Sequence, residues 1–395
     1  MKAFFASLGK RRTYVVIELF FVYLALGVGL IMLGSVLPQL RAAYALDYQT
    51  GGALLFAQSI GYLGIGLVTG VLSVKLGLKR AYLLLSALLP LGLLMLLTNG
   101  APLWLMTAML LTGLSKGAIT DYNNRIMSEY ADGQAAPLNL MHAFFAIGAC
   151  VAPLLVLFCL GRGQDGWRLA MILCLVLLAA ALVFGLFMHM DDERSTDAYQ
   201  APAGGGFGFF RDRLFLQTTA MGFFYQAVEA SMMGWLTSFY VDSGALKAGA
   251  AQVVTSLLWV SLLVGRFACS VIAAHWRPWQ MTLVMCAGIG LFLVLMVCGT
   301  TLPLLLLSTI GLGLCMSGMY GTLVSNAGVV FNRYPAAMGL FVTLTGIGAA
   351  LAPAMVGVVA DYAGIRWGFA SLLVAALLLI VAAVVNARYF RRTPQ

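Results

Sequence analysis

The residues best suited to chemistry are the few charged side chains inside the long apolar runs of this chain. Glu229 lies about fifteen residues into the run 214–240, near its middle. Tyr225 and Gln226 precede it by four and three residues, so all three share one face if the run is helical. A carboxyl group in apolar surroundings can bind and release a proton, or accept hydrogen bonds from a polyol. A structural pairing with Arg266 is the alternative.

A second group of polar residues lies in the run 102–125. Lys116 is near its middle, and Asp121 and Asn124 follow. Asp121 and Arg125 are four residues apart and can pair along one helix. Lys116 does not share a face with Asp121. It therefore either finds a partner on another helix or lines a cavity.

Three further ionisable residues have a functional and a structural interpretation. Arg266 can bind an anionic solute, or pair with Glu229 or Asp121. His142 can relay protons, or pack through hydrogen bonds. Glu18 lies close to a basic N-terminal stretch, and we expect its side chain to extend to that surface. The remaining candidates for lining a solute path are Gln58, Asn139, Asn326 and the aromatic Trp259.

The amino-acid composition indicates whether these residues lie in a soluble protein or in a membrane protein. The chain has 395 residues, 62% hydrophobic and 9% charged, whereas soluble domains are about 45–50% apolar and about 25% charged. A membrane helix needs about 20 mostly apolar residues. Twelve runs meet this requirement, so we predict an all-α integral membrane protein with twelve transmembrane helices. The runs are 13–37, 50–74, 81–99, 102–125, 138–160, 166–189, 214–240, 248–273, 280–298, 302–330, 336–360 and 366–387.

One polar and glycine-rich stretch, 190–213, separates the twelve runs into two sets of six. We predict an N-terminal half over 1–189, a cytoplasmic linker over 190–213 and a C-terminal half over 214–395. The halves also match at an offset of 200 residues. The IGA and AP of 147–153 recur at 347–353, and Gly113 and Trp167 face Gly313 and Trp367. Such a repeat is typical of transporters whose halves rock about a central site.

Basic residues predict the orientation. With the N-terminus in the cytoplasm, the cytoplasmic segments hold sixteen of the 23 lysines and arginines and the opposite side holds five. The positive-inside rule then places both termini and the linker in the cytoplasm, as in a multi-pass protein of the inner membrane. The net charge of +9 follows from this orientation, and we expect no nucleic-acid partner. The N-terminal run is too long for a cleaved signal sequence, and we interpret it as the first span.

The loop after the second run resembles a known signature. Residues 70–80 read GVLSVKLGLKR, similar to the major facilitator superfamily pattern G-x-L-[AS]-D-[RK]-x-G-[RK]-[RK]. Val74 stands where that pattern has an aspartate, so the latch that this aspartate makes must be weaker or built differently here. The resemblance implies the major facilitator fold. The matching positions, expected to control conformational change, are Gly70, Lys75, Gly77, Lys79 and Arg80.

Other segments resemble the fucose–galactose–proton symporters and related sugar transporters. They are LNLMHAFF at 138–145, and Glu229, Trp235 and Tyr240 in the seventh run. Trp259 and Gly265-Arg266 in the eighth run and Asn124 in the fourth also match. Asp121 lies one position from the acidic residue of that group. This resemblance implies a sugar substrate and a proton as the coupling ion, with sodium as the alternative.

Several activities have no motif in this sequence. There is no phosphate-binding loop, no HExxH and no GxSxG, and the seven cysteines and three histidines show no metal-site spacing. We therefore expect a monomeric secondary transporter, not an enzyme, with no cofactor or metal. The alternatives are an exporter of organic anions or amphiphiles that uses Lys116 and Arg266, and a non-transporting membrane protein with a plugged cavity.

Overall fold

The computed structural model describes residues 4–5, 8–131, 135–163, 165–188 and 207–392. These residues form helices and turns, with no strand among them. Ten helices are long and apolar enough to cross a membrane, and the bent helix α3 (Tyr48–Leu76) makes eleven. The remaining predicted span is α9 (Arg213–Asp242), which has 30 residues. The predicted all-α membrane fold is confirmed.

The chain divides into two compact units. One comprises residues 1–46 and 53–199, and the other comprises residues 47–52 and 200–395. The predicted linker 190–213 falls mostly outside the described residues. Its described end forms a short 3₁₀ helix, η2 (Phe207–Arg211), directly before α9.

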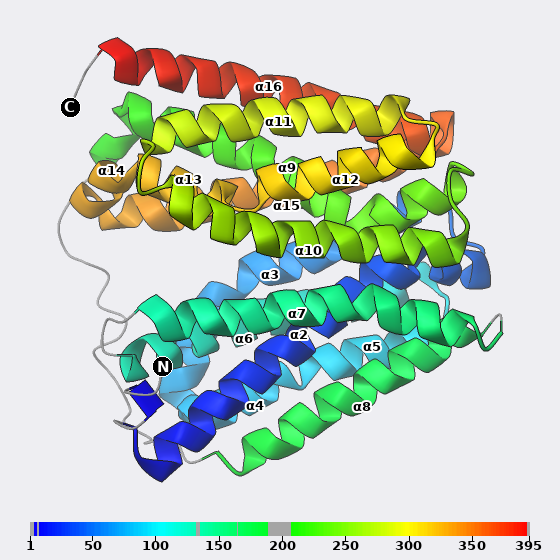
Figure 1. Ribbon diagram of the computed structural model, residues 1–395. Helices are drawn as coiled ribbons and strands as arrows, with labels where there is room; N and C mark the ends of the chain where they lie inside the picture. Colours follow the sequence, from blue (N-terminus) through cyan, green and yellow to red (C-terminus); the bar gives the residue numbers. More distant parts are fainter. Residues whose placement is uncertain (1–3, 6–7, 132–134, 164, 189–206, 393–395) are drawn as a thin grey trace. The chain divides into compact units, whose positions relative to one another are not determined.

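The N-terminal unit is a bundle of long helices that run side by side (Figure 1). Its first helix packs against both α7 and α8, and α5 packs against α6 and α8. The third predicted span is divided in two at Ala87. The helices are α2 (Gly9–Tyr44), most of α3, α4 (Leu78–Ser86), α5 (Leu88–Thr98), α6 (Pro102–Tyr130), α7 (Ala135–Leu160) and α8 (Gly166–Leu186).

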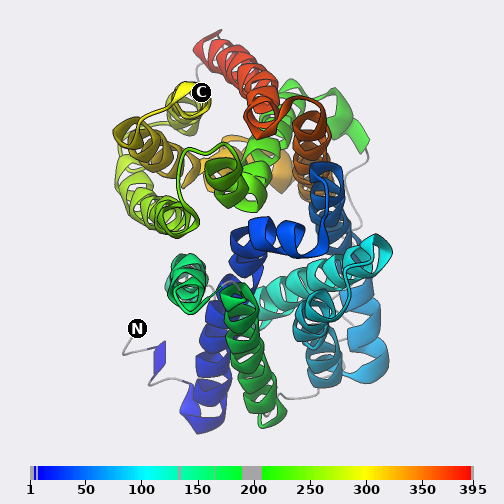
Figure 2. The same cartoon turned by 90° about the vertical axis from the view of Figure 1, so that its right-hand side faces the viewer.

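The C-terminal unit has the corresponding bundle, which Figure 2 views from its end. Here α9 packs against α15 and α16, and α11 packs against α12 and α16. The tenth predicted span, 302–330, is not continuous. It breaks at Ser317-Gly318 and again at Ala327. The helices after α9 are α10 (Ala248–Ile272), α11 (Pro278–Cys298), α12 (Leu302–Met316), α13 (Met319–Asn326), α14 (Gly328–Arg333), α15 (Pro335–Ala363) and α16 (Ile365–Arg392).

Local sequence explains where several of these helices begin. Proline occupies the first turn of α6, α11, α12 and α15, where its missing N–H would have no helical partner. The Asp212 carboxylate caps α9 by accepting hydrogen bonds from the backbone N–H groups of Leu214 and Phe215. Such caps fix the start of the helix that carries Glu229.

The internal repeat includes the glycines at which two helices of each unit come into close backbone contact. A methyl group on Gly113 would overlap the carbonyl oxygen of Gln58, where α6 meets α3. The same would occur 200 residues later between Gly313 and the carbonyl of Leu258, where α12 meets α10. Glycine lets two helices approach closely in a membrane. Both units therefore repeat one helix contact in the same register.

The first turn of α3 belongs to the C-terminal unit. Its N–H groups at Tyr48 and Gln49 donate to the two oxygens of Asp361 in α15, at 2.8 and 2.6 Å. Gly52 and Gly357 allow this contact, because a methyl group on either would meet backbone atoms of the other helix. A carboxylate at this position also interacts favourably with the helix dipole.

Candidate functional site

The predicted residues lie in two polar clusters, one in each unit. In the C-terminal unit, Tyr225 and Glu229 are one turn apart on α9. The Tyr225 hydroxyl lies 2.7 Å from Glu229 Oε1 and 2.9 Å from the carbonyl oxygen of Met316. Tyr225 is 2% exposed and Glu229 is half-buried. The predicted shared face of these two residues is present.

The Met316 carbonyl is available because α12 ends there. The chain breaks at Ser317-Gly318 before α13 starts, and carbonyl groups at a helix end need partners outside the helix. Gly265 of α10 lies against Ser317 at this break. The next residue, Arg266, is exposed and acts electrostatically on the Tyr225 hydroxyl. Tyr225 thus connects α9 to a helix break, with a cation on a third helix.

The number of protons available for hydrogen bonds around the Tyr225 hydroxyl depends on the charge of Glu229. A tyrosine has one hydroxyl proton and can also accept. When Glu229 is ionised, this single proton is shared between the carboxylate and the Met316 carbonyl. When Glu229 is protonated, it can donate to the tyrosine oxygen and leave the tyrosine proton for Met316. The arrangement therefore accommodates both states of the carboxyl group.

In the N-terminal unit, Tyr23 of α2 is the centre of the second cluster. Its hydroxyl donates to Asn124 Oδ1 of α6 at 3.2 Å. Its ring meets the His142 ring of α7 edge to face, with 5.3 Å between centroids. Two predicted residues from different helices are therefore joined by a tyrosine that the sequence analysis did not select.

Two further predicted residues lie along α6 and contact α3. The Lys116 ammonium lies over the Tyr62 ring, 4.7 Å from its centroid. Such cation–π contacts are worth about 0.5–2 kcal/mol. Asp121 accepts a hydrogen bond from the Thr69 hydroxyl at 3.3 Å. Contacts to α3, through Tyr62 and Thr69, position the charged residues of this helix.

The other predicted residues have varied surroundings. Gln58 donates to the Thr112 hydroxyl at 3.1 Å, inside the α3–α6 contact. Asn326 is buried and donates to Thr218 and Asn386. Trp259 is buried. Gln226 is half-buried on α9, and Asn139 is exposed near the start of α7. Their assignment to a solute path stays a prediction.

Glu18 differs from expectation. Its side chain is 4% exposed and does not reach the surface. Arg12, near which we expected it, instead lies over the Tyr130 ring at 5.1 Å. The reason is that α2 packs against α6, α7 and α8, and the Glu18 carboxyl group lies beside Gly185 of α8, with Leu83 of α4 near the same glycine.

The loop signature forms the turn between α3 and α4. Gly77 has φ 84° and ψ 154°, a conformation that a residue with a side chain adopts only under strain. Lys79 donates from Nζ to the Leu186 carbonyl at 2.7 Å and so binds the C-terminal end of α8. Lys75 and Arg80 are exposed, as is Val74 at the position of the missing aspartate, and Gly70 is half-buried.

The sequence pattern did not indicate several groups that contribute to the two polar clusters. Tyr23, Tyr62 and Thr69 are ordinary residues of apolar helices, and the Met316 carbonyl has no side-chain signal at all. Only the position of Gly318 in the tenth run hinted at a break. Among the residues that the structure describes, no group of three or more His, Cys, Asp or Glu side chains forms a metal site.

Comparison with known proteins agrees with this architecture. The sequence profile described as the Major Facilitator Superfamily matches residues 19–333. An uncharacterized MFS-type transporter of Yersinia pestis is 24% identical over 373 residues, covering 91% of this chain and 92% of that protein.

Two solved structures show the same fold. The nucleoside transporter NupG, in a mutant form, superposes with a TM-score of 0.79 at 16% identity, covering 95% of this chain and 99% of that one. The fucose:proton symporter of E. coli, also a mutant, superposes with a TM-score of 0.61 at 17% identity, covering 95% and 99%. The profile match spans most of the sequence and the helices have the arrangement it implies. The chain belongs to the Major Facilitator Superfamily.

Proposed function

We propose that this protein is a secondary active transporter that moves a small polar solute, a sugar or a related metabolite, by alternating access and coupled to protons. The observation that carries this proposal is the Tyr225–Glu229 pair at the α12 break. It offers a carboxyl group in a mostly apolar unit whose surroundings accommodate both protonation states. An ionisable residue within a membrane helix marks an ion or substrate pathway by default.

The solute contacts are assigned to the polar groups of each unit. In the N-terminal unit they are Lys116, Asn124 and His142, which offer donors and acceptors beside aromatic rings. In the C-terminal unit they are Glu229 and Arg266. A polyol needs this mixture of charged and neutral partners. Two proteins of similar structure are a nucleoside transporter and a fucose:proton symporter, and nucleosides and fucose are small polar solutes.

The same proposal places the protein in the inner membrane, as a monomer with both termini in the cytoplasm. The basic residues Lys75 and Arg80 are exposed at the α3–α4 turn, which suits the cytoplasmic side.

The first test is thermal unfolding of the detergent-purified protein with sugars, nucleosides, organic anions and drugs at about pH 5.5 and about pH 7.5. A transported solute at 100 times its Kd stabilises the native state by about 2.7 kcal/mol. We expect a sugar or nucleoside to stabilise the wild type and Glu129→Gln, a control at an exposed acid, but not Glu229→Gln. Stabilisation by organic anions alone, lost on changing Lys116 or Arg266, would instead identify an anion exporter.

The second test measures solute uptake into proteoliposomes with and without an imposed pH gradient. Glu229→Gln should abolish the dependence on the gradient, because the amide cannot bind the proton. If this variant keeps full pH-dependent uptake, Glu229 is not the proton carrier.

A further inference from the structure

Glu18 is a buried acid that the proposed solute pathway does not use. Its side chain is 4% exposed, and its Oε1 forms no hydrogen bond with any described residue. No ion pair to Glu18 is present among the described residues either. Gly185 of α8 leaves room for this oxygen, since a methyl group there would lie only 3.6 Å from it.

Two other buried oxygens near Glu18 also have no hydrogen-bond partner among the described residues. They are the hydroxyl of Tyr82 on α4, which is 1% exposed, and Oδ1 of Asn123 on α6, which is 0% exposed. Asn123 is held beside Glu18 because its Nδ2 donates to the Leu19 carbonyl at 3.4 Å. Tyr82 lies within electrostatic range of Glu18 and near the Asn123 amide. Three helices thus bring the side chains of Glu18, Tyr82 and Asn123 close together, with Tyr82 facing both of the others.

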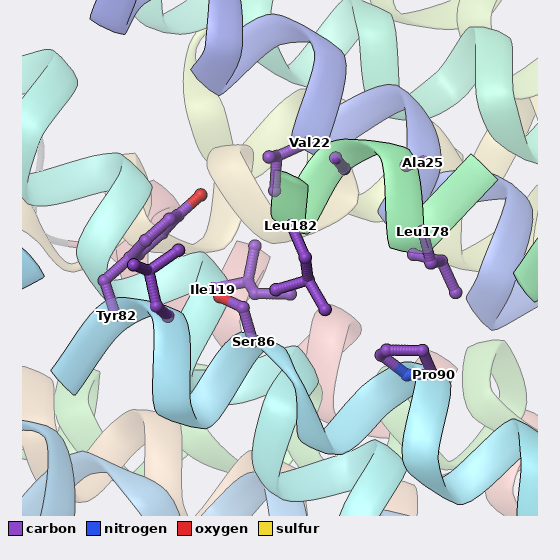
Figure 3. A pocket seen from close by; sticks show the side chains of 10 residues that line it. Val22, Ala25, Tyr82, Ser86, Pro90, Ile119, Leu178 and Leu182 are labelled. Carbon is purple, nitrogen blue, oxygen red and sulfur yellow. The ribbon is translucent and has the colours of Figure 1, made fainter. Parts of the chain in front are cut away.

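A pocket lies beside this region, and Tyr82 lines it. Figure 3 shows Tyr82 and Ser86 at one wall, Val22 and Ala25 of α2 at another, and Leu178 and Leu182 of α8 completing it. Val22 is one helical turn beyond Glu18 on the same face. The Ser86 hydroxyl is also buried without a partner among the described residues.

The hydrogen inventory of this site lacks one proton. With Glu18 ionised, the Tyr82 hydroxyl has one proton and two nearby acceptors, Glu18 Oε1 and Asn123 Oδ1. A buried carboxylate with an unpaired oxygen is unfavourable. One added proton on Glu18 gives two donors for the two acceptors and removes the buried charge.

The neighbouring ionisable groups are already engaged elsewhere. Tyr14, one turn earlier on α2, donates to the Phe184 carbonyl at 2.9 Å. On α4, the Lys79 ammonium donates to the Leu186 carbonyl. On α6 and α8, Asn123 and Gly185 lie close to Glu18, and neither residue titrates. Lys79 therefore neutralises the end of α8 and does not form an ion pair with Glu18.

We propose that Glu18, together with Tyr82 and Asn123, is a proton-binding site of the N-terminal unit, separate from Glu229. The Glu18 carboxylate takes up the proton from solution and releases it to solution again. No other bond is made or broken. Proton binding itself is independent of the transported solute. A contribution of this proton to solute transport rests on the proposed transport function.

The test is infrared difference spectroscopy of the purified protein in lipid nanodiscs, titrated between about pH 5 and about pH 9. We expect the wild type to show a titrating carboxylic-acid C=O band that Glu18→Gln lacks and that Glu129→Gln and Glu229→Gln retain. Tyr82→Phe, which keeps the ring, should retain the band with a displaced midpoint. This measurement needs no solute, so its result tests the Glu18 proton site independently of the proposed transport function.

Two outcomes would overturn the proposal. One is an identical difference spectrum for wild type and Glu18→Gln, which would make Glu18 a structural residue that does not titrate. The other is loss of the acid band on adding Na⁺, but not K⁺, at fixed pH, which would assign the site to sodium.

Discussion

At the scale of single residues, the two proposed proton sites depend on which polar groups share a hydrogen. The Tyr225 hydroxyl serves a carboxyl group and a helix-end carbonyl at once. At Glu18, the Tyr82 hydroxyl likewise lies near two acceptors. Both proposed proton sites therefore combine an acidic side chain, half-buried at Glu229 and buried at Glu18, with a tyrosine hydroxyl that serves more than one acceptor.

Tyr225→Phe should therefore affect both stability and coupling. The substitution removes the donor that Glu229 and the Met316 carbonyl share, and a buried carbonyl that loses its donor costs about 1–3 kcal/mol. We expect a lower unfolding temperature and altered pH dependence of uptake. Tyr362→Phe is the matched control, because Tyr362 is 88% exposed and should behave like wild type. Equal behaviour of the two variants would contradict the role of Tyr225.

At the scale of elements, close helix contacts and helix ends position the site residues. The α3–α6 contact at Gly113 holds Tyr62 against Lys116, and the α10–α12 contact at Gly313 brings Arg266 near the α12 break. Helix ends matter because their free backbone groups recruit partners, as Met316 and the start of α3 show.

Gly113→Ala and Gly313→Ala should both destabilise the protein. Each added methyl group would overlap a backbone carbonyl, so the helices must separate, and overpacking of this kind costs about 1–3 kcal/mol. Gly64→Ala provides the control, since nothing lies within 4 Å of a methyl group there. Thermal unfolding of the three variants measures the difference. Unchanged stability at both positions would show that these contacts are not tight.

Asp361→Ala should loosen the first turn of α3. The variant loses two short hydrogen bonds to the Tyr48 and Gln49 amides, and loss of a helix cap costs about 0.5–2 kcal/mol. Hydrogen exchange at these two amides should become faster. Asp165→Ala is the comparison, because Asp165 makes only an exposed pair with Arg168 at 3.7 Å, which contributes little. If the amide exchange does not change, Asp361 does not cap α3.

At the scale of the whole molecule, lipid is the solvent. Many large apolar side chains are exposed on the outer helix faces, including Val176 in the middle of α8 and Phe267 on α10. In water such a surface would cause aggregation, whereas in a bilayer it is the stable arrangement.

Val176→Asp should therefore impair insertion and folding, because a charge at the centre of a membrane helix costs about 2.5–3.5 kcal/mol. The yield of folded protein in the membrane, measured by size-exclusion chromatography after extraction, should fall sharply. Val176→Leu should leave it unchanged. A normal yield for the aspartate variant would mean that this face of α8 does not contact lipid.

The sequence by itself determined the fold class, because twelve apolar runs of about 20 residues have few alternatives to membrane helices. It also determined the register of the repeat, since glycines 200 residues apart mark the same contact, and the shared face of Tyr225 and Glu229, since spacing along a helix is local information. The tertiary structure alone decided the remaining partners. Tyr23 joining Asn124 to His142, the Met316 carbonyl at a helix break, and the burial of Glu18 all depend on contacts between distant segments. Lipid-facing and protein-facing residues are equally apolar in sequence, so helix periodicity could not distinguish a snorkelling acid from a buried one.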